Sequence, residues 1–251
     1  MPHQATPATP ATPDALAALR ARWTQSLEAA RTTPGNGNAP DPTAYADNLL
    51  ARYQEPRRRY HTVTHLTAVL DHIDVLEREL EQAGPPAPAP DITPDPTLDL
   101  PLVRLAAWFH DAVYAPDRSE NEERSARLAE RALTEAGVSP AGTAEVARLV
   151  RLTLTHDPAP DDRNGQVLCD ADLAILAAAP DTYAAYTAAV REEYAFVPDD
   201  AFRAGRAAVL RQLLDLPQLF RTPYGTEHWE EPARANIAAE LRRLEEGSGP
   251  I

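Results

Sequence analysis

The chain has 251 residues, of which 43% are hydrophobic, and a formal net charge of −14. This length and composition suffice for one substantial hydrophobic core. The negative charge argues against nucleic acid polymers and acidic membranes as partners, but it permits small phosphorylated molecules whose charge a bound divalent cation neutralises. A single cysteine, Cys169, and the lack of a membrane-spanning run or signal sequence favour a cytoplasmic protein.

Patterns typical of helices follow one another along almost the whole chain. Residues 1–13 repeat Ala, Thr and Pro, and we expect a disordered tail there because such a segment cannot bury apolar area. From 14 to 246 apolar residues recur with a helical period, except over 84–97, a proline-rich segment expected to be a surface loop. Residues 247–251 are expected to be a flexible end. Strand-like alternation is nearly absent, so the pattern predicts an all-α, single-domain helical bundle.

Capping and turn signals predict where the individual helices begin and end. Asp41-Pro42 is typical of an N-cap followed by proline at the first helical position, and Ser119 with Glu122 matches a capping box. The expected helices start at about Asp14 and Pro42, run from Tyr60 to Ala83, from Pro101 through Asp111, from Ser119 to Gly137 and over 142–156, start again after Asp170, and follow 183–194, 202–214 and 232–246.

The segment Trp108-Phe109-His110-Asp111 places an imidazole and a carboxylate next to each other inside an apolar helix. A helix that is apolar on nearly all sides is expected at the centre of a domain. An unpaired charge is costly in such a place, so the Asp111 carboxylate needs a partner. A divalent metal is one candidate, and an arginine from the run 57–59 is the structural alternative.

Other residues of metal-binding type lie elsewhere in the chain. His61 and His65 are four residues apart, which on a helix places both side chains on one face. The alternative is that one makes a core hydrogen bond while the other faces water. Asp170 and Asp172 lie where a helix is expected to begin, so one of them suits an N-cap. Imidazoles together with carboxylates suit a divalent ion such as Mn, Fe, Co, Ni, Zn or Mg, and the identity stays open.

Taken in order, these residues resemble the HD superfamily of metal-dependent phosphohydrolases, whose ligands occur in the order His, His-Asp, Asp. The resemblance rests on YHTVTHL at 60–66, WFHDAVY at 108–114 and DADL at 170–173. It extends over about residues 41–245 and implies the all-α fold of that superfamily. Thr62 stands where asparagine is common in the related proteins.

The resemblance also implies roles for individual residues. It implies as metal ligands His65, His110, Asp111 and Asp172, with Asp170 as the alternative to Asp172 for the fourth position. By the same resemblance, His61 is the general acid that protonates the leaving oxygen, and an imidazole with a pKa of about 6.5 suits this role near neutral pH. Glu122 and Asp170 are further candidate catalytic residues, although each is also explained as a helix cap.

His156 has three interpretations of equal weight. It could bind a second metal, contact a substrate phosphate, or cap the end of its own helix, where a partial negative charge favours an imidazolium. Four arginines are candidate phosphate ligands that the sequence does not rank: Arg124, Arg151, Arg163 and Arg191.

The expected function is hydrolysis of a phosphate ester or anhydride in a small phosphorylated molecule, with a nucleotide favoured as substrate. Two other functions stay open. One is a di-iron oxygenase, for which His156 would be an additional ligand. The other is a non-catalytic binding or regulatory protein whose fold the metal stabilises. Nothing in the sequence predicts the oligomeric state.

Overall fold

The structure, a computed structural model, describes residues 11–31, 41–83 and 98–246. The proline-rich loop predicted for 84–97, the flexible end at 247–251 and nearly all of the predicted tail lie outside the described residues. The helices and one short 3-10 helix, η1, are α1 Pro13–Ala30, α2 Pro42–Tyr53, α3 Val63–Ala83, α4 Leu100–Phe109, α5 Asn121–Glu135, α6 Pro140–Leu152, α7 Arg163–Leu173, η1 Ala174–Ala177, α8 Pro180–Glu193, α9 Asp199–Asp215, α10 Pro223–His228 and α11 Glu230–Glu246.

Side-chain caps explain where many of these helices begin. The carboxylate of Asp41 accepts a hydrogen bond from the Thr43 backbone N–H at 2.9 Å, with proline following it as predicted. Ser139 and Asp162 cap α6 and α7 in the same way. Within the described residues there is no β-strand, and the only β-type pairing is an isolated bridge between Arg31 and Val138. The all-α, single-domain prediction is therefore confirmed.

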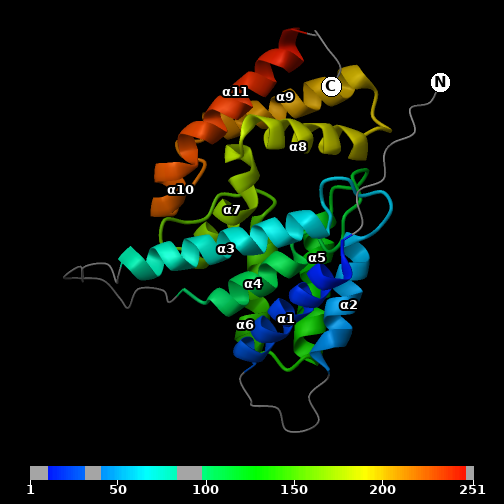
Figure 1. The fold of residues 1–251 in the computed structure, drawn as a ribbon, viewed down its shortest axis with the longest axis vertical. Helices are drawn as coiled ribbons and strands as arrows, with labels where there is room; N and C mark the ends of the chain where they lie inside the picture. The colour runs from blue at the N-terminus through cyan, green and yellow to red at the C-terminus, as the bar shows by residue number, and fades with distance from the viewer. Residues whose placement is uncertain (1–10, 32–40, 84–97, 247–251) are drawn as a thin grey trace.

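The helices form two packed groups with the candidate site between them. Helices α1 to α7 share one large apolar core, and η1, α8, α9 and α11 share a second, smaller core. Figure 1 shows α8, α9 and α11 together at one end of the molecule, with α3 and α7 lying between them and the rest of the first group. Helix α4 lies at the centre of the first core, and seven of its ten side chains are buried. The prediction of a central helix over this segment is correct.

Several predicted helix ends are wrong, and the differences affect the site. Helix α4 stops at Phe109, so His110 is its C-cap and Asp111 lies in the following turn. Helix α3 begins at Val63, which leaves His61 in the turn before it. Helix α6 stops at Leu152, and His156 follows with a positive φ of 50°. Periodicity locates a helix well but locates its ends poorly, because the same apolar residues continue into the turns.

Two capping predictions are also wrong. The predicted box of Ser119 and Glu122 is not formed, since α5 begins at Asn121 after Glu120, which makes no side-chain capping bond. Instead, the Asn121 side chain holds the preceding loop by bonds with both the N–H and the carbonyl of Ala115. Asp170 does not cap the start of a helix either, because α7 begins seven residues earlier, at Arg163.

None of the helices within the described ranges has by itself the length and apolar character to cross a membrane. One bent pair, 163–177 with 180–193, meets the criteria of length and composition only when its two parts are joined across a bend of 104°.

Candidate metal centre

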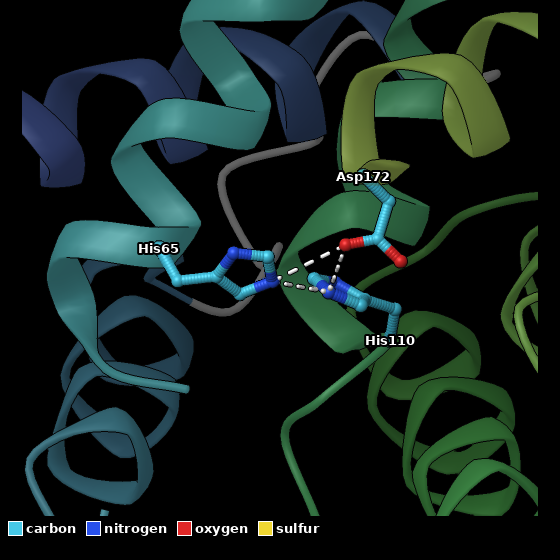
Figure 2. A group of neighbouring side chains, drawn as sticks. All are labelled: His65, His110 and Asp172. Atoms are coloured by element: carbon cyan, nitrogen blue, oxygen red, sulfur yellow. Dashed lines mark hydrogen bonds and ion pairs between the residues drawn. The ribbon is translucent and has the colours of Figure 1, made fainter. Parts of the chain in front are cut away.

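Four side chains from three separated parts of the chain meet between α3, α4 and α7. The Nε2 atom of His65 lies 3.1 Å from Nε2 of His110 and 3.3 Å from Oδ1 of Asp172. Figure 2 shows these three side chains pointing toward one another. Asp111 adds its Oδ2 atom, 3.4 Å from His65 Nε2 and 3.1 Å from His110 Nε2. The structure therefore brings together all four residues that the resemblance implies as ligands.

These spacings suit one divalent ion. Ligands at 2.0–2.2 Å around a tetrahedral ion are about 3.3 to 3.6 Å apart, and somewhat closer around an ion with more ligands. The distances given above between the donor atoms of the four side chains fall in or just below this range. The donor atoms of His65, His110 and Asp172 all lie within 4.8 Å of one another, as a shared ion requires. Asp111 is not in this group of three, although its Oδ2 atom lies close to both histidines. Two imidazoles with one or two carboxylates form a donor set that several divalent metals accept.

Hydrogen bonds and charges prepare the donor atoms for a cation. His110 Nδ1 lies 2.8 Å from the carbonyl of Ala107, which accepts its proton and leaves Nε2 as the atom facing the cluster. Burial alone would raise the pKa of Asp111 and of Asp172. The neighbouring histidines outweigh this effect and hold the pKa of both carboxyls well below the usual range. Both carboxylates are therefore in the charged form that binds a cation.

A buried arginine fixes the two segments that carry His61 and Asp111. The guanidinium of Arg58 donates to the carbonyl of His61 at 3.0 Å and to the carbonyl of Asp111 at 2.8 Å. It also lies over the ring of Tyr114, 5.4 Å from the centroid. The alternative partner for Asp111 proposed from the sequence, an arginine of the run 57–59, thus contacts its backbone and not its carboxylate. The carboxylate remains directed at the histidines.

His61 lies beside the cluster and is held by Glu193. The Nδ1 atom of His61 is 2.6 Å from Oε2 of Glu193, which also accepts a hydrogen bond from the Tyr114 hydroxyl at 2.8 Å. The other oxygen of Glu193 accepts from the backbone N–H groups of 59, 60 and 61. With Nδ1 donating to Glu193, Nε2 is the free ring nitrogen of His61. The ring centroid of His61 is 5.6 Å from that of His65, so the predicted proximity holds although His61 is not helical.

His156 contacts the outer oxygen of Asp172. Its Nε2 atom lies 2.8 Å from Oδ2, while Oδ1 of the same carboxylate faces the two cluster histidines. Of the three roles predicted for His156, capping of its helix end is wrong, because the residue lies four positions beyond the end of α6 and its side chain bonds to Asp172. The geometry places it against a ligand of the cluster.

Asp170 is not part of the cluster, so its predicted catalytic role is wrong. Its carboxylate is fully buried and accepts hydrogen bonds from the backbone N–H groups of Arg221 and Thr222 and from the Thr222 hydroxyl. These bonds hold the segment that leads into α10. Burial raises the pKa of Asp170 to about 6 despite the bonds. Asp170 and Asp172 are two residues apart on α7, which directs their side chains to nearly opposite sides of the helix.

The cluster opens into a cavity of about 460 Å³, within the usual size range for small-molecule sites. The lining includes His61, the four cluster residues, Glu122 and His156. Glu122 thus lies at the cavity and not in a capping box. None of the four predicted phosphate-binding arginines lines the cavity: Arg124, Arg151, Arg163 and Arg191. Two of these are paired with acids elsewhere, Arg151 with Glu123 and Arg191 with Asp199.

Sequence reasoning gave Glu193 no role, although the residue lies in a segment that the resemblance covers, and it missed the observed role of Arg58. Glu193 is 132 residues from His61 and follows another glutamate on a helix, so no local signal marks it as buried. Arg58 lies in a run of three arginines in which only the fold decides which one is buried. Comparisons of the chain with models of protein families, with curated proteins and with solved structures gave no match. The candidate site therefore rests on the residues and their geometry.

Proposed function

We propose that the protein is a metal-dependent phosphohydrolase of the HD type that acts on a small phosphorylated molecule. The observation that carries the proposal is the convergence of His65, His110, Asp111 and Asp172 at the wall of a cavity. A divalent ion held by these residues would supply the Lewis acid that polarises a phosphoryl oxygen and acidifies a nucleophilic water.

The position of His61 favours catalysis over a purely structural metal. A structural site has a closed shell of ligands and needs no acid beside it. Here His61 lines the same cavity as the ligands, and Glu193 orients it through Nδ1. In the proposed hydrolysis the P–O bond to the leaving group breaks and a water oxygen joins phosphorus. His61 takes part as an imidazolium: Nδ1–H stays bonded to Glu193, Nε2 gives its proton to the departing oxygen, and the proton lost by the attacking water passes to solvent. This type of assistance adds about 10² to 10⁴ in rate.

Elemental analysis of protein purified without added metal or chelator tests the first half of the proposal. We expect about one equivalent of a divalent metal in the wild type, and loss of that metal in His65→Ala. His72→Ala is the matched control, since His72 lies seven residues further along the same helix and bonds to the Ala171 carbonyl outside the cluster. Full metal content in His65→Ala would contradict the assignment.

Phosphate release by the metal-loaded protein tests the second half. The screen should include phosphate monoesters, nucleotides and phosphoanhydrides. We expect His61→Asn to keep its metal and to lose at least a hundredfold in kcat, because it removes a proton donor and no ligand. A wild type with bound metal that releases phosphate from none of these compounds would exclude the hydrolase and leave a metal-stabilised binding protein.

A further inference from the structure

The cavity beside the metal cluster has an apolar side that the proposed hydrolysis does not use. Among the described residues, three large hydrophobic side chains are exposed: Leu154 at 65%, Phe196 at 60% and Val209 at 47%. Two of the three, Leu154 and Val209, line this cavity. Apolar area left exposed at the mouth of a binding site is a common mark of ligand contact.

Helix α9 supplies much of this apolar side. Arg206, Val209 and Leu213 line the cavity at spacings of three and four residues, so one face of α9 is turned toward it. Leu173 and Leu176 line the cavity from α7 and η1. Apolar side chains from three elements, and Leu154 from the turn after α6, thus line one part of a space that also reaches the cluster. We call this set of five, Leu154, Leu173, Leu176, Val209 and Leu213, the apolar wall.

Two arginines line the cavity, and only one of them is free to bind an anion. Arg206 is paired with Glu240 at 2.7 Å and also donates to the Tyr186 hydroxyl at 3.1 Å. Arg118 is exposed, and within the described parts of the chain its guanidinium makes no hydrogen bond or ion pair. One unpaired guanidinium together with the metal cluster suits the binding of a single phosphate group. It does not provide for the chain of phosphates in a nucleoside triphosphate, because the lining offers no second unpaired arginine for the further groups and Glu122 adds a like charge.

We infer that the substrate is a phosphate monoester whose organic part is uncharged and mainly apolar, an alkyl or aryl group. This inference rests on the proposed function, because the metal cluster marks where the phosphate binds. The phosphate lies between the cluster and Arg118, and the organic group packs against the apolar wall. The volume of about 460 Å³ admits such a molecule with its organic group inside the cavity.

Binding of alkylphosphonates tests the inference without any need for turnover, since a P–C bond is not hydrolysed as an ester is. We would titrate the purified full-length protein with methyl-, butyl- and hexylphosphonate and with inorganic phosphate, and follow the heat released. Burial of a methylene group favours binding by a factor of about four when it is complete. We expect Kd to fall about two- to fourfold for each added methylene until the cavity is filled.

Matched variants assign this chain-length dependence to the apolar wall. Val209→Thr keeps the shape of the side chain and adds a hydroxyl, and Leu154→Asn keeps its approximate size. Together they should reduce the gain from methyl- to hexylphosphonate at least fivefold and leave the binding of inorganic phosphate unchanged. Phe196→Asn is the control, because it removes an equally exposed apolar side chain that does not line the cavity.

The binding of inorganic phosphate, which has no organic group, tests the role of Arg118. Arg118→Gln should weaken the binding of inorganic phosphate about tenfold, the loss of one charge-assisted contact, and Arg118→Lys should restore part of it. Arg124→Gln, an exposed arginine that does not line the cavity, is the control. Because all five positions changed in these variants are exposed, the variants should fold as the wild type does.

Any one of three binding results would overturn the inference, and so would one further outcome. One is a Kd that does not change with chain length, a second is a dependence that survives the double variant, and the third is phosphate binding that does not respond to Arg118→Gln. If instead the double variant changes only the sedimentation behaviour, the exposed residues serve contact with another protein and the inference also fails. The hydrolase proposal is judged separately, by phosphate release from the matching alkyl phosphates. Tight, length-dependent binding without release would support the binding inference and exclude the hydrolase.

Discussion

Replacing Glu193 by glutamine should destabilise the fold and release His61 at the same time. The carboxylate is buried, and it accepts hydrogen bonds from His61 Nδ1, from the Tyr114 hydroxyl and from the backbone of 59–61. Glutamine has nearly the same shape and corresponds to the protonated acid, so the substitution isolates the contribution of the charge. It should leave the core packing intact.

The pKa of Glu193 provides the magnitude. Burial alone would raise it, but the bonds from His61 and the backbone outweigh burial and lower the pKa from 4.5 to about 2. Each pKa unit corresponds to about 1.4 kcal/mol, so the ionised form of Glu193 contributes about 3 kcal/mol to the free energy of unfolding at neutral pH. Because the folded-state pKa is the lower one, this contribution is fully present above about pH 4.5 and is lost as the pH falls toward about 2.

Urea unfolding at several pH values measures this effect. We expect Glu193→Gln to lower the free energy of unfolding by about 3 kcal/mol at pH 7, with a difference from the wild type that narrows below about pH 4.5. Glu192→Gln is the control, because this neighbouring side chain is exposed and pairs with Arg59 only at 3.3 Å. Its effect should stay below about 1 kcal/mol. The reasoning would be refuted if Glu193→Gln left the free energy of unfolding unchanged at pH 7. It would also be refuted if the difference between variant and wild type were as large at pH 3 as at pH 7.

Three further predictions concern the surroundings of the site. Arg58→Met should cost about 3 kcal/mol in urea unfolding, because it leaves three buried or partly buried carbonyls without this donor, whereas Arg57→Met at the exposed neighbouring position should be neutral. Gly225→Ala should lower the free energy of unfolding by about 1 to 3 kcal/mol, since the new Cβ would lie 2.5 Å from a carboxylate oxygen of Asp170. Gly205→Ala, with open space around it in α9, should raise the free energy of unfolding by up to about 1 kcal/mol. Equal effects of the two changes in urea unfolding would contradict this account. Removal of metal by a chelator should lower the melting temperature by about 5 to 10 °C. This is the effect expected when a metal that binds only the folded state, and is present at about 100 times its Kd, is withdrawn. A melting temperature that calorimetry finds unchanged would argue against a metal bound to the native cluster.

Much of the fold follows from local patterns in the sequence. The helical period of apolar residues predicts the helices because each helix buries one face, and α4, apolar on nearly all sides, is central as expected. The N-cap at Asp41 is read from two adjacent residues. The exact ends of the helices do not follow from such local patterns. His61, His110 and His156 all lie just outside the helices predicted to carry them, because the end of a helix depends on what the following turn contacts.

The amino-acid sequence by itself determined the all-α class and the residue types from which a metal site could be built. Tertiary structure decided which of them meet. Asp170 and Asp172 have the same chemistry and are two residues apart, yet one holds the entry to α10 and the other faces the histidines, because nearly opposite sides of α7 contact different parts of the molecule. Glu193 and Arg58 acquire their roles in the same way. Their partners are remote in the chain or are backbone carbonyls, which no side-chain pattern records, so only the packed fold brings charge and partner together.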